Sequence, residues 1–293
     1  MKIFLLKICG FGILLVLLNI TLFGCANDLY YKSYDSYSIK QASYLFADSH
    51  GLPLGQDIQK FGIFNFSAGS DSYFDIKRKL NFLLDRRKID TIYLSVDEHT
   101  LSPYREKSNN LDRSLFYATR HDYANIFSFI KAKLFHNIIF LQPKIGTLLK
   151  KSLLSRLESY SSESSKKPNK VIWEQLDRNT KIERSKERAY SQFDYNTKSD
   201  DLLSTLLEII QICEKNDIVL IGIKFPVTEI YKEEIKNKNF GADSILEAYG
   251  HTVLDPRKSI VFGDSLFSNQ DHLNIEGGKL FSAWLFKTIN SSN

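Results

Sequence analysis

The sequence predicts an α/β protein built around a doubly wound, mainly parallel sheet, with a helical insertion and an N-terminal membrane anchor. Three observations predict this fold. Short apolar segments alternate with segments of helical spacing, which is typical of a parallel sheet covered on both faces. A long segment at about 104–200 interrupts this alternation. The first 26 residues are mostly apolar and unlike the remainder of the chain.

The N-terminal segment has the length and composition of a membrane span. Lys2 and Lys7 precede a run of about 19 mostly apolar residues, which as a helix cover roughly 28 Å, close to the hydrocarbon thickness of a bilayer. Basic residues lie before this run and none falls within it, so the domain is expected on the extracytoplasmic (periplasmic) side of a bacterial cell membrane.

The predicted organisation is a signal anchor or lipoprotein signal over 1–26, a polar tether over 27–41 and an α/β domain over 42–290. Cys25 follows Leu-Phe-Gly as in a bacterial lipoprotein signal, so a lipid on Cys25 is an alternative to an uncleaved anchor. Either anchor leaves the domain outside the cytoplasm.

Charge and cysteine content exclude several classes of function. The net charge of +5 includes Lys2 and Lys7 of the anchor, and the rest of the chain is too weakly basic to predict nucleic-acid binding. Cys213 is the only cysteine of the domain, so no internal disulfide can form there. No Cys/His spacing indicates zinc, and neither a metal nor another cofactor is expected.

The expected elements follow one another in the order of an α/β protein. Strands are expected within 42–47, 61–68, 89–96, 218–226 and 252–255, and helices within 73–88, 201–217, 239–251 and up to residue 289. The insertion is mostly helical in pattern, contains a Ser/Lys-rich loop at 161–170 and is expected to form a cap beside the sheet. Its segment 126–157 has lysines among apolar residues. Such a segment fits a membrane surface or, more simply, a core-facing helix pair.

Two polar stretches contain the residues that could perform chemistry. Asp48, Ser49 and His50 directly follow the first predicted strand, and active sites of parallel sheets gather at the carboxyl ends of strands. A serine at this point can be a nucleophile whose own N–H faces a developing oxyanion, although a polar loop is the plainer interpretation. Far along the chain, His272 precedes the last helix beside Asp271, as a general base with an acceptor would require.

Four blocks of the sequence resemble the SGNH/GDSL hydrolases, in particular their membrane-anchored branch related to D-alanyl transfer and polysaccharide acylation. They are FADSHG with Ser49, FNFSAGSDS with Asn65 and Gly69, KFPVTEIY, and the terminal NQDHLNIEGGKLFSAWL. The terminal block is the most specific and matches at His272, Leu273, Asn274, Gly277, Phe281, Ser282 and Leu285. The resemblance covers 42–100 and 200–290 and leaves the insertion outside it.

The resemblance implies a flavodoxin-like SGNH fold and a serine acyl-enzyme. Ser49 would be the nucleophile and His272 the base, and the amides of Ser49 and Gly69 would stabilise the oxyanion. The implied substrates are acyl esters of a cell-envelope polysaccharide or exopolysaccharide, with the acyl group passed to water or to a sugar hydroxyl. A membrane acyltransferase is a partner that the resemblance allows.

The sequence also departs from the family pattern. Asn269 stands where the family has an acid, so Asp271 is the first candidate for the acid and Asp264 the second. As the direct chain neighbour of His272, Asp271 is expected to be poorly placed to orient the His272 imidazole. Asp97 and His99 lie where the wider superfamily has an oxyanion-binding asparagine, and an ionised carboxylate cannot donate a hydrogen bond. A non-catalytic envelope assembly or glycan-binding protein that keeps the fold is therefore the alternative.

Overall fold

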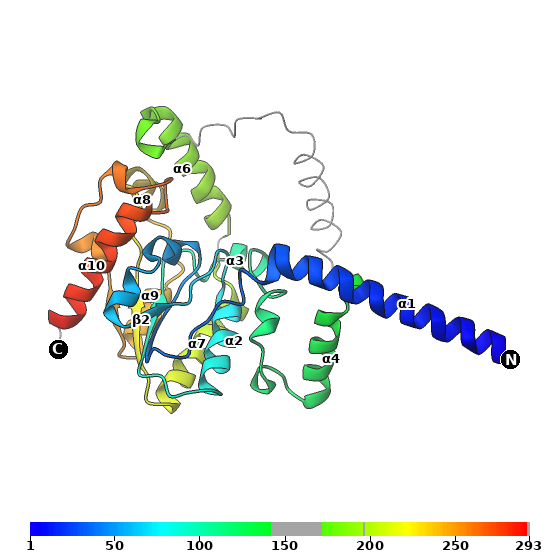
Figure 1. Cartoon of the computed structure of the whole chain (residues 1–293). Coiled ribbons are helices and arrows are strands. Elements are labelled where there is room, and N and C mark those ends of the chain that lie inside the picture. Colours follow the sequence, from blue (N-terminus) through cyan, green and yellow to red (C-terminus); the bar gives the residue numbers. More distant parts are fainter. Residues whose placement is uncertain (142–171, 196, 292–293) are drawn as a thin grey trace. The chain divides into compact units, whose positions relative to one another are not determined.

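The computed structural model describes residues 1–141, 172–195 and 197–291, so the predicted loop at 161–170 lies outside the described residues (Figure 1). The chain divides into two compact units. The anchor unit comprises Met1–Tyr37 and Asp112–Asn169, and the sheet unit comprises Ser38–Leu111 and Lys170–Asn293.

Five parallel strands form the sheet, in the order β2-β1-β3-β4-β5. They are β1 Ser43–Phe46, β2 Ile63–Asn65, β3 Thr91–Ser95, β4 Val219–Ile223 and β5 Thr252–Leu254. Each strand lies inside a predicted segment, and the α/β prediction with a parallel sheet is confirmed. The chain passes from β1 outward to β2 and then returns to the other side of β1 to form β3, so the strand order reverses between β1 and β3.

Helices connect and cover the strands. The described α-helices are α1 Lys2–Ala26, α2 Tyr73–Leu84, α3 Pro103–Lys107, α4 Ile126–Asn137, α6 Arg178–Phe193, α7 Asp200–Lys215, α8 Glu229–Ile235, α9 Ala242–Ala248 and α10 Ile275–Ser291. In the described part of the chain, only α1 is long and apolar enough to cross a membrane. It is the helix expected from the N-terminal apolar run.

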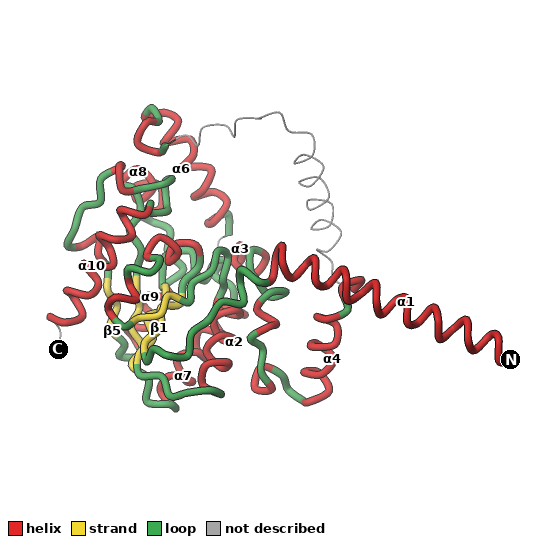
Figure 2. Tube along the Cα trace, viewed as in Figure 1, coloured by secondary structure: helices red, strands yellow, loops and turns green. Residues whose placement is uncertain are grey.

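Alternate residues of the strands face opposite layers of the sheet unit. Leu45, Tyr93 and Ile223 are buried in one cluster with residues of α10, which covers this face. Gly222 faces the opposite layer, where a Cβ would crowd Leu246 of α9. Figure 2 shows the strands between α10 on one side and α2 on the other.

The boundaries of the two units differ from the predicted organisation. The described residues 112–141 group with the N-terminal segment, whereas α6 and the described residues around it belong to the sheet unit, so 104–200 is not a single cap. The predicted tether begins with a π-helix at Asn27–Tyr31, and Tyr31 and Tyr34 are buried within the anchor unit. Tyr117 donates a hydrogen bond to the Tyr34 carbonyl at 2.7 Å, so the tether is folded against this unit at least as far as Tyr34.

Candidate active site

Ser49 lies where the strand order of the sheet reverses. It is the first residue of a 3₁₀-helix, Ser49–Leu54, that follows β1 after Ala47 and Asp48. The Asp48 carboxylate caps this helix by accepting a hydrogen bond from the His50 amide at 2.9 Å. The carboxyl edge between β1 and β3 is the position where open parallel sheets commonly bind ligands.

Two glycines let the start of α10 pack closely, Gly278 against this 3₁₀-helix and Gly277 against Leu266. A Cβ at Gly278, in the first turn of α10, would collide with the Pro53 carbonyl, and one at Gly277 would collide with the Leu266 carbonyl. Glycine is therefore required for α10 to begin directly against the residues that follow Ser49. This packing places the loop before α10, which includes His272, beside Ser49.

Ser49, His272 and Asp271 form a continuous hydrogen-bonded chain. The Nε2 atom of His272 lies 2.7 Å from the Ser49 Oγ, and its Nδ1 atom lies 2.8 Å from the Asp271 Oδ1. The Asp271 side chain is 1% exposed, whereas that of His272 is 18% exposed and Ser49 is half-buried. The hydroxyl and the imidazole can thus be reached from solvent, and the carboxylate cannot.

A tight turn explains how Asp271 reaches the imidazole of its own neighbour. The Asn269 Oδ1 accepts hydrogen bonds from the amides of Asp271 at 3.1 Å and of His272 at 2.9 Å, which folds the chain back on itself. The same oxygen lies 3.0 Å from the His272 Nδ1. The expectation that a chain neighbour is poorly placed for this contact is wrong, because the turn at Asn269 directs both side chains to the same point.

Asp271 is held as an anion by further groups. Its Oδ2 accepts a hydrogen bond from the Arg188 Nε on α6 at 2.7 Å and lies 3.6 Å from the His50 Nε2. Burial alone would raise the pKa of Asp271, but its contacts with His272 and His50 hold that pKa well below the usual range. The carboxylate therefore stays ionised at neutral pH.

His50 bridges two buried carboxylates. Its Nδ1 lies 2.7 Å from the Asp48 Oδ1, and its other nitrogen faces Asp271. The ring also stacks on that of His272, with centroids 4.5 Å apart and planes inclined by 7°. Burial lowers the pKa of His50, but the charges of Asp48 and Asp271 and hydrogen bonds to them raise it well above the usual value. His50 is thus an imidazolium between two anions.

This arrangement predicts a pH dependence of folding stability that depends on His50. The pKa of His50 is raised in the folded state, so protonated His50 stabilises the fold. This stabilisation is complete at a pH below the ordinary histidine pKa of 6.5 and is lost as the pH rises through the pKa of the folded state. Above that ordinary value, the unfolding free energy should fall by up to about 1.4 kcal/mol per pH unit. Urea unfolding followed by tryptophan fluorescence tests this, since Trp173 and Trp284 both lie in the sheet unit. The His50→Gln variant should lack the slope, and an equal slope in both proteins would contradict the assignment.

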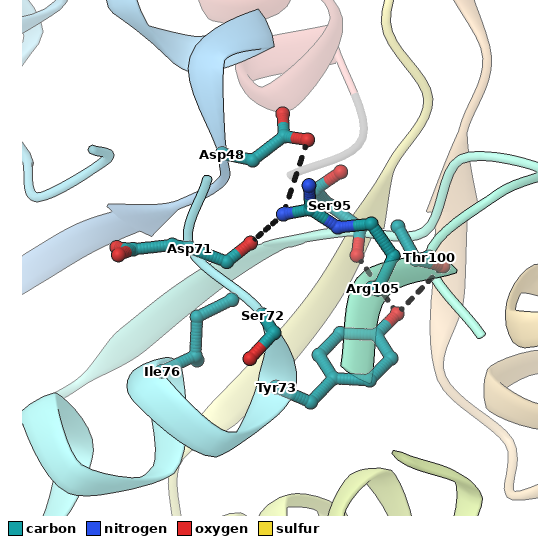
Figure 3. A pocket seen from close by; sticks show the side chains of 8 residues that line it. All are labelled: Asp48, Asp71, Ser72, Tyr73, Ile76, Ser95, Thr100 and Arg105. Carbon is teal, nitrogen blue, oxygen red and sulfur yellow. Dashed lines mark hydrogen bonds and ion pairs between the residues drawn. The ribbon is translucent and has the colours of Figure 1, made fainter. Parts of the chain in front are cut away.

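Asp48 is the other end of this network. Its Oδ2 lies 3.3 Å from the His99 Nε2 and 3.5 Å from an Arg105 guanidinium nitrogen. Burial raises the pKa of Asp48, but the charges of His50 and Arg105 outweigh this effect and hold that pKa well below the usual range. Figure 3 shows Arg105 directed toward Asp48 and toward the main chain of Asp71. The cavity beside them measures about 10 Å³, which is room for about one water molecule, so it is not a substrate pocket.

Gly69 lies in a loop that is fixed against the end of β1. The amides of Phe66 and Ala68 donate to the carbonyls of Leu45 and Ala47 at 2.9 and 3.2 Å, which continues the parallel pairing beyond β2. Gly69 comes next in the chain, and its carbonyl accepts a hydrogen bond from Asn110 Nδ2 at 2.8 Å. The loop therefore follows the last residues of β1 up to the neighbourhood of Ser49.

A buried ion pair holds the same loop. Lys79 of α2 is 1% exposed and donates to Asp71 Oδ2 at 2.5 Å and to the Phe66 carbonyl at 2.8 Å. Asn110 donates to the other Asp71 oxygen at 2.7 Å. Removing one partner would leave the other charge buried without this opposite charge beside it.

Lys79→Met is therefore expected to lower the unfolding free energy of the sheet unit by about 3–5 kcal/mol. Tryptophan-monitored urea unfolding measures this loss. Lys77→Met is the matched control, because the Lys77–Glu208 pair is partly exposed and should contribute about 1 kcal/mol or less. Adding Asp71→Asn to Lys79→Met should recover part of the loss, and a Lys79→Met effect no larger than that of Lys77→Met would disprove the role of the pair.

The remaining predicted site residues lie elsewhere or have structural roles. Asn65 donates to the Gly51 carbonyl at 2.8 Å and accepts from the Ser67 amide, so it joins two loops. Asp97 accepts from the Phe225 amide at 2.7 Å and from Ser95 Oγ, and it ties the ends of β3 and β4 together. His99 faces Asp48, with its Nε2 atom 3.3 Å from the Asp48 Oδ2. Asp264 pairs with Lys181 at 2.8 Å and is not the acid beside His272.

Among the residues that the structure describes, two groups of side chains have the composition of metal ligands. They are Asp48 with His50 and His99, and His50 with Asp271 and His272, each with donor atoms within 4.8 Å of one another. In both groups the carboxylate already pairs with an arginine, and a cation would have to displace hydrogen bonds of 2.7–2.8 Å. The chemistry of these groups favours a proton-linked network over metal binding.

Sequence reasoning missed three members of this network. No role for His50 follows from the sequence beyond its position between Ser49 and Gly51, after the first predicted strand. Arg188 and Arg105 both fall in the predicted insertion, where nothing in their spacing points to the site. Their roles depend on where α3 and α6 lie within the folded sheet unit, which brings Arg105 to Asp48 and Arg188 to Asp271.

Comparison with known proteins does not identify a family: the chain matches no protein-family model and no curated protein sequence.

Proposed function

We propose that this protein is an exported, membrane-anchored serine esterase or O-acyltransferase of SGNH type that acts on acyl esters of cell-envelope or exopolysaccharide glycans. The observation that supports this most strongly is the chain of contacts from Ser49 through His272 to Asp271, with distances of 2.7 and 2.8 Å. Nucleophilic serines are recognised by this geometry, whatever the order of the residues along the chain.

Acylation begins when the Ser49 Oγ attacks the ester carbonyl carbon and its proton passes to the His272 Nε2. The tetrahedral oxyanion is stabilised by the amides of Ser49 and Gly69, and Asp271 stabilises the imidazolium. The intermediate collapses as the C–O bond to the alcohol breaks and the alkoxide takes the proton from Nε2. The products are an acyl ester on Ser49 and a free hydroxyl.

Deacylation repeats these steps with a second hydroxyl compound. His272 removes a proton from water or from a sugar hydroxyl, whose oxygen attacks the acyl carbon, and Ser49 leaves with that proton. Water gives a carboxylic acid, and a sugar hydroxyl gives a new ester. Hydrolysis and transfer therefore use the same residues and differ only in the acceptor.

The surroundings of the site fit a polymeric substrate. Ser49 and His272 are partly exposed at the edge of the sheet, so a glycan could reach them without entering an enclosed pocket. The N-terminal helix α1 supports a membrane anchor, and the basic residues at its start support an extracytoplasmic location for the sheet unit. The strand order and the four sequence blocks support the SGNH type.

Detergent-solubilised full-length protein mixed with p-nitrophenyl acetate tests the reaction class. A serine acyl-enzyme should release a burst of nitrophenolate equal to the enzyme concentration, followed by a slower steady rate. Adding oligosaccharide acceptors should produce acetylated sugar if the protein is a transferase and should leave the products unchanged if it is a hydrolase. Absence of both burst and turnover in folded protein would overturn the proposal and favour the non-catalytic alternative.

A further inference from the structure

The anchor unit contains a second apolar element beside α1. The α1 helix has 25 residues, and its apolar window has a mean hydropathy of 2.5 and no buried positions. At about 1.5 Å per residue such a helix is long enough to span the hydrocarbon layer. The further inference rests on α1 crossing the membrane, as in the proposed function.

α4 is fixed to α1 at a point inside the apolar segment. The Asn19 side chain donates to the Asn137 carbonyl at 2.9 Å and accepts from the Ile139 amide at 2.8 Å. Ile139 is fully buried in a cluster with Ala26 and Tyr31, and Leu22 and Phe23 of α1 pack against this cluster. Asn19 lies seven residues before the last residue of α1, so this contact lies about 10 Å below the C-terminal end of the helix.

α4 exposes large apolar side chains on one face. Phe127 is 79% exposed, Ile130 53% and Leu134 56%, and their spacing places them on the same side of the helix. Lys131 is the basic residue on this side, and a long lysine side chain can reach the headgroups while its stem contacts acyl chains. Lys133 turns away and donates to the carbonyls of Leu115 and Phe116.

We propose that α4 lies in the interfacial layer of the leaflet at the C-terminal end of α1, with Phe127, Ile130 and Leu134 in contact with lipid acyl chains. Figures 1 and 2 show α4 running across α1 rather than along it, so α4 would lie roughly in the membrane plane if α1 crosses that membrane. Interfacial helices bury their apolar face about 5–10 Å below the headgroup boundary, which matches the level of Asn19. Acyl chains are therefore the partner that the position of α4 indicates.

The depth of α4 can be measured with nitroxide labels on the full-length protein in lipid nanodiscs that hold one copy each. Cys9, Cys25 and Cys213 are first replaced by alanine. Phe127→Cys or Ile130→Cys then carries the label. Leu14→Cys in α1 is the reference for lipid, and Val261→Cys, 82% exposed in the sheet unit, is the reference for water. Collision rates with oxygen and with a water-soluble nickel chelate report the surroundings of each label.

The labels on α4 should resemble the Leu14 reference, with oxygen collisions exceeding nickel collisions severalfold. Labels that resemble the Val261 reference would overturn the proposal, and so would labels shielded from both reagents, which indicate contact with protein. A Leu14 label exposed to nickel would remove the premise that α1 crosses the membrane. Phe127→Trp in discs with brominated acyl chains provides an independent test, because lipid contact quenches its emission. Esterase activity is measured in a separate experiment, so failure of the α4 proposal can be distinguished from failure of the proposed function.

Discussion

Ser49→Ala is expected to lower the rate of ester hydrolysis by about 10⁴-fold or more, because it removes the proposed nucleophile and leaves only binding and oxyanion stabilisation. The burst of nitrophenolate should disappear altogether. The fold should be preserved, since the lost Ser49–His272 hydrogen bond contributes only about 1 kcal/mol. Steady-state and burst kinetics on detergent-solubilised protein measure both effects.

Ser204→Ala is the matched control for this substitution. Ser204 is exposed on α7, so its replacement should leave both the burst and the steady rate unchanged. If Ser49→Ala instead retained a tenth of the activity and a full burst, another residue would be the nucleophile and the assignment of Ser49 would be wrong.

Asp271→Asn is expected to lower kcat/KM by about 10³-fold. In a serine triad, loss of the carboxylate charge costs about 10⁴-fold, chiefly because the histidine adopts the wrong tautomer. Here the Asn269 oxygen, 3.0 Å from the His272 Nδ1, still favours a proton on that nitrogen, so the loss should be smaller. The substitution also leaves Arg188 and His50 facing a neutral amide, so tryptophan-monitored unfolding must accompany the kinetics.

Asn269→Asp tests whether Asp271 acts through its charge on His272 or only supports the fold. The Oδ1 atoms of Asn269 and Asp271 both lie within 3.0 Å of the same imidazole nitrogen. A carboxylate at either position can therefore stabilise the imidazolium. Adding Asn269→Asp to Asp271→Asn should restore activity at least about tenfold, because the charge interaction returns. No recovery in a folded double variant would show that position 269 cannot replace Asp271.

Much of the fold could be predicted from the sequence because strands and helices differ in the period of their apolar residues. Each strand falls inside a predicted segment. The lateral order of the strands and the division into two units could not be predicted, since both depend on contacts between distant segments. The grouping of 112–141 with the N-terminal segment depends on contacts such as that of Asn19 with Ile139, which no local pattern encodes.

The candidate site was predictable only in part. Ser49 and His272 stand in recognisable sequence blocks, and the structure brings them together. The contact of Asp271 with the His272 imidazole depends on a backbone turn closed by Asn269, which residue spacing alone could not reveal. Asp97 has a recognisable position in the sequence, but its carboxylate is occupied by the Phe225 amide because β3 and β4 end side by side.

The most direct test of the account is covalent labelling of the folded, full-length protein with a fluorophosphonate, which modifies only activated serines. Intact-mass measurement should show a single adduct, and peptide mapping should place it on Ser49. The adduct should be absent from Ser49→Ala and formed much more slowly in His272→Ala, because the imidazole must remove the hydroxyl proton. Unlabelled folded protein, or an adduct on a different serine, would contradict the claim that Ser49 and His272 act together.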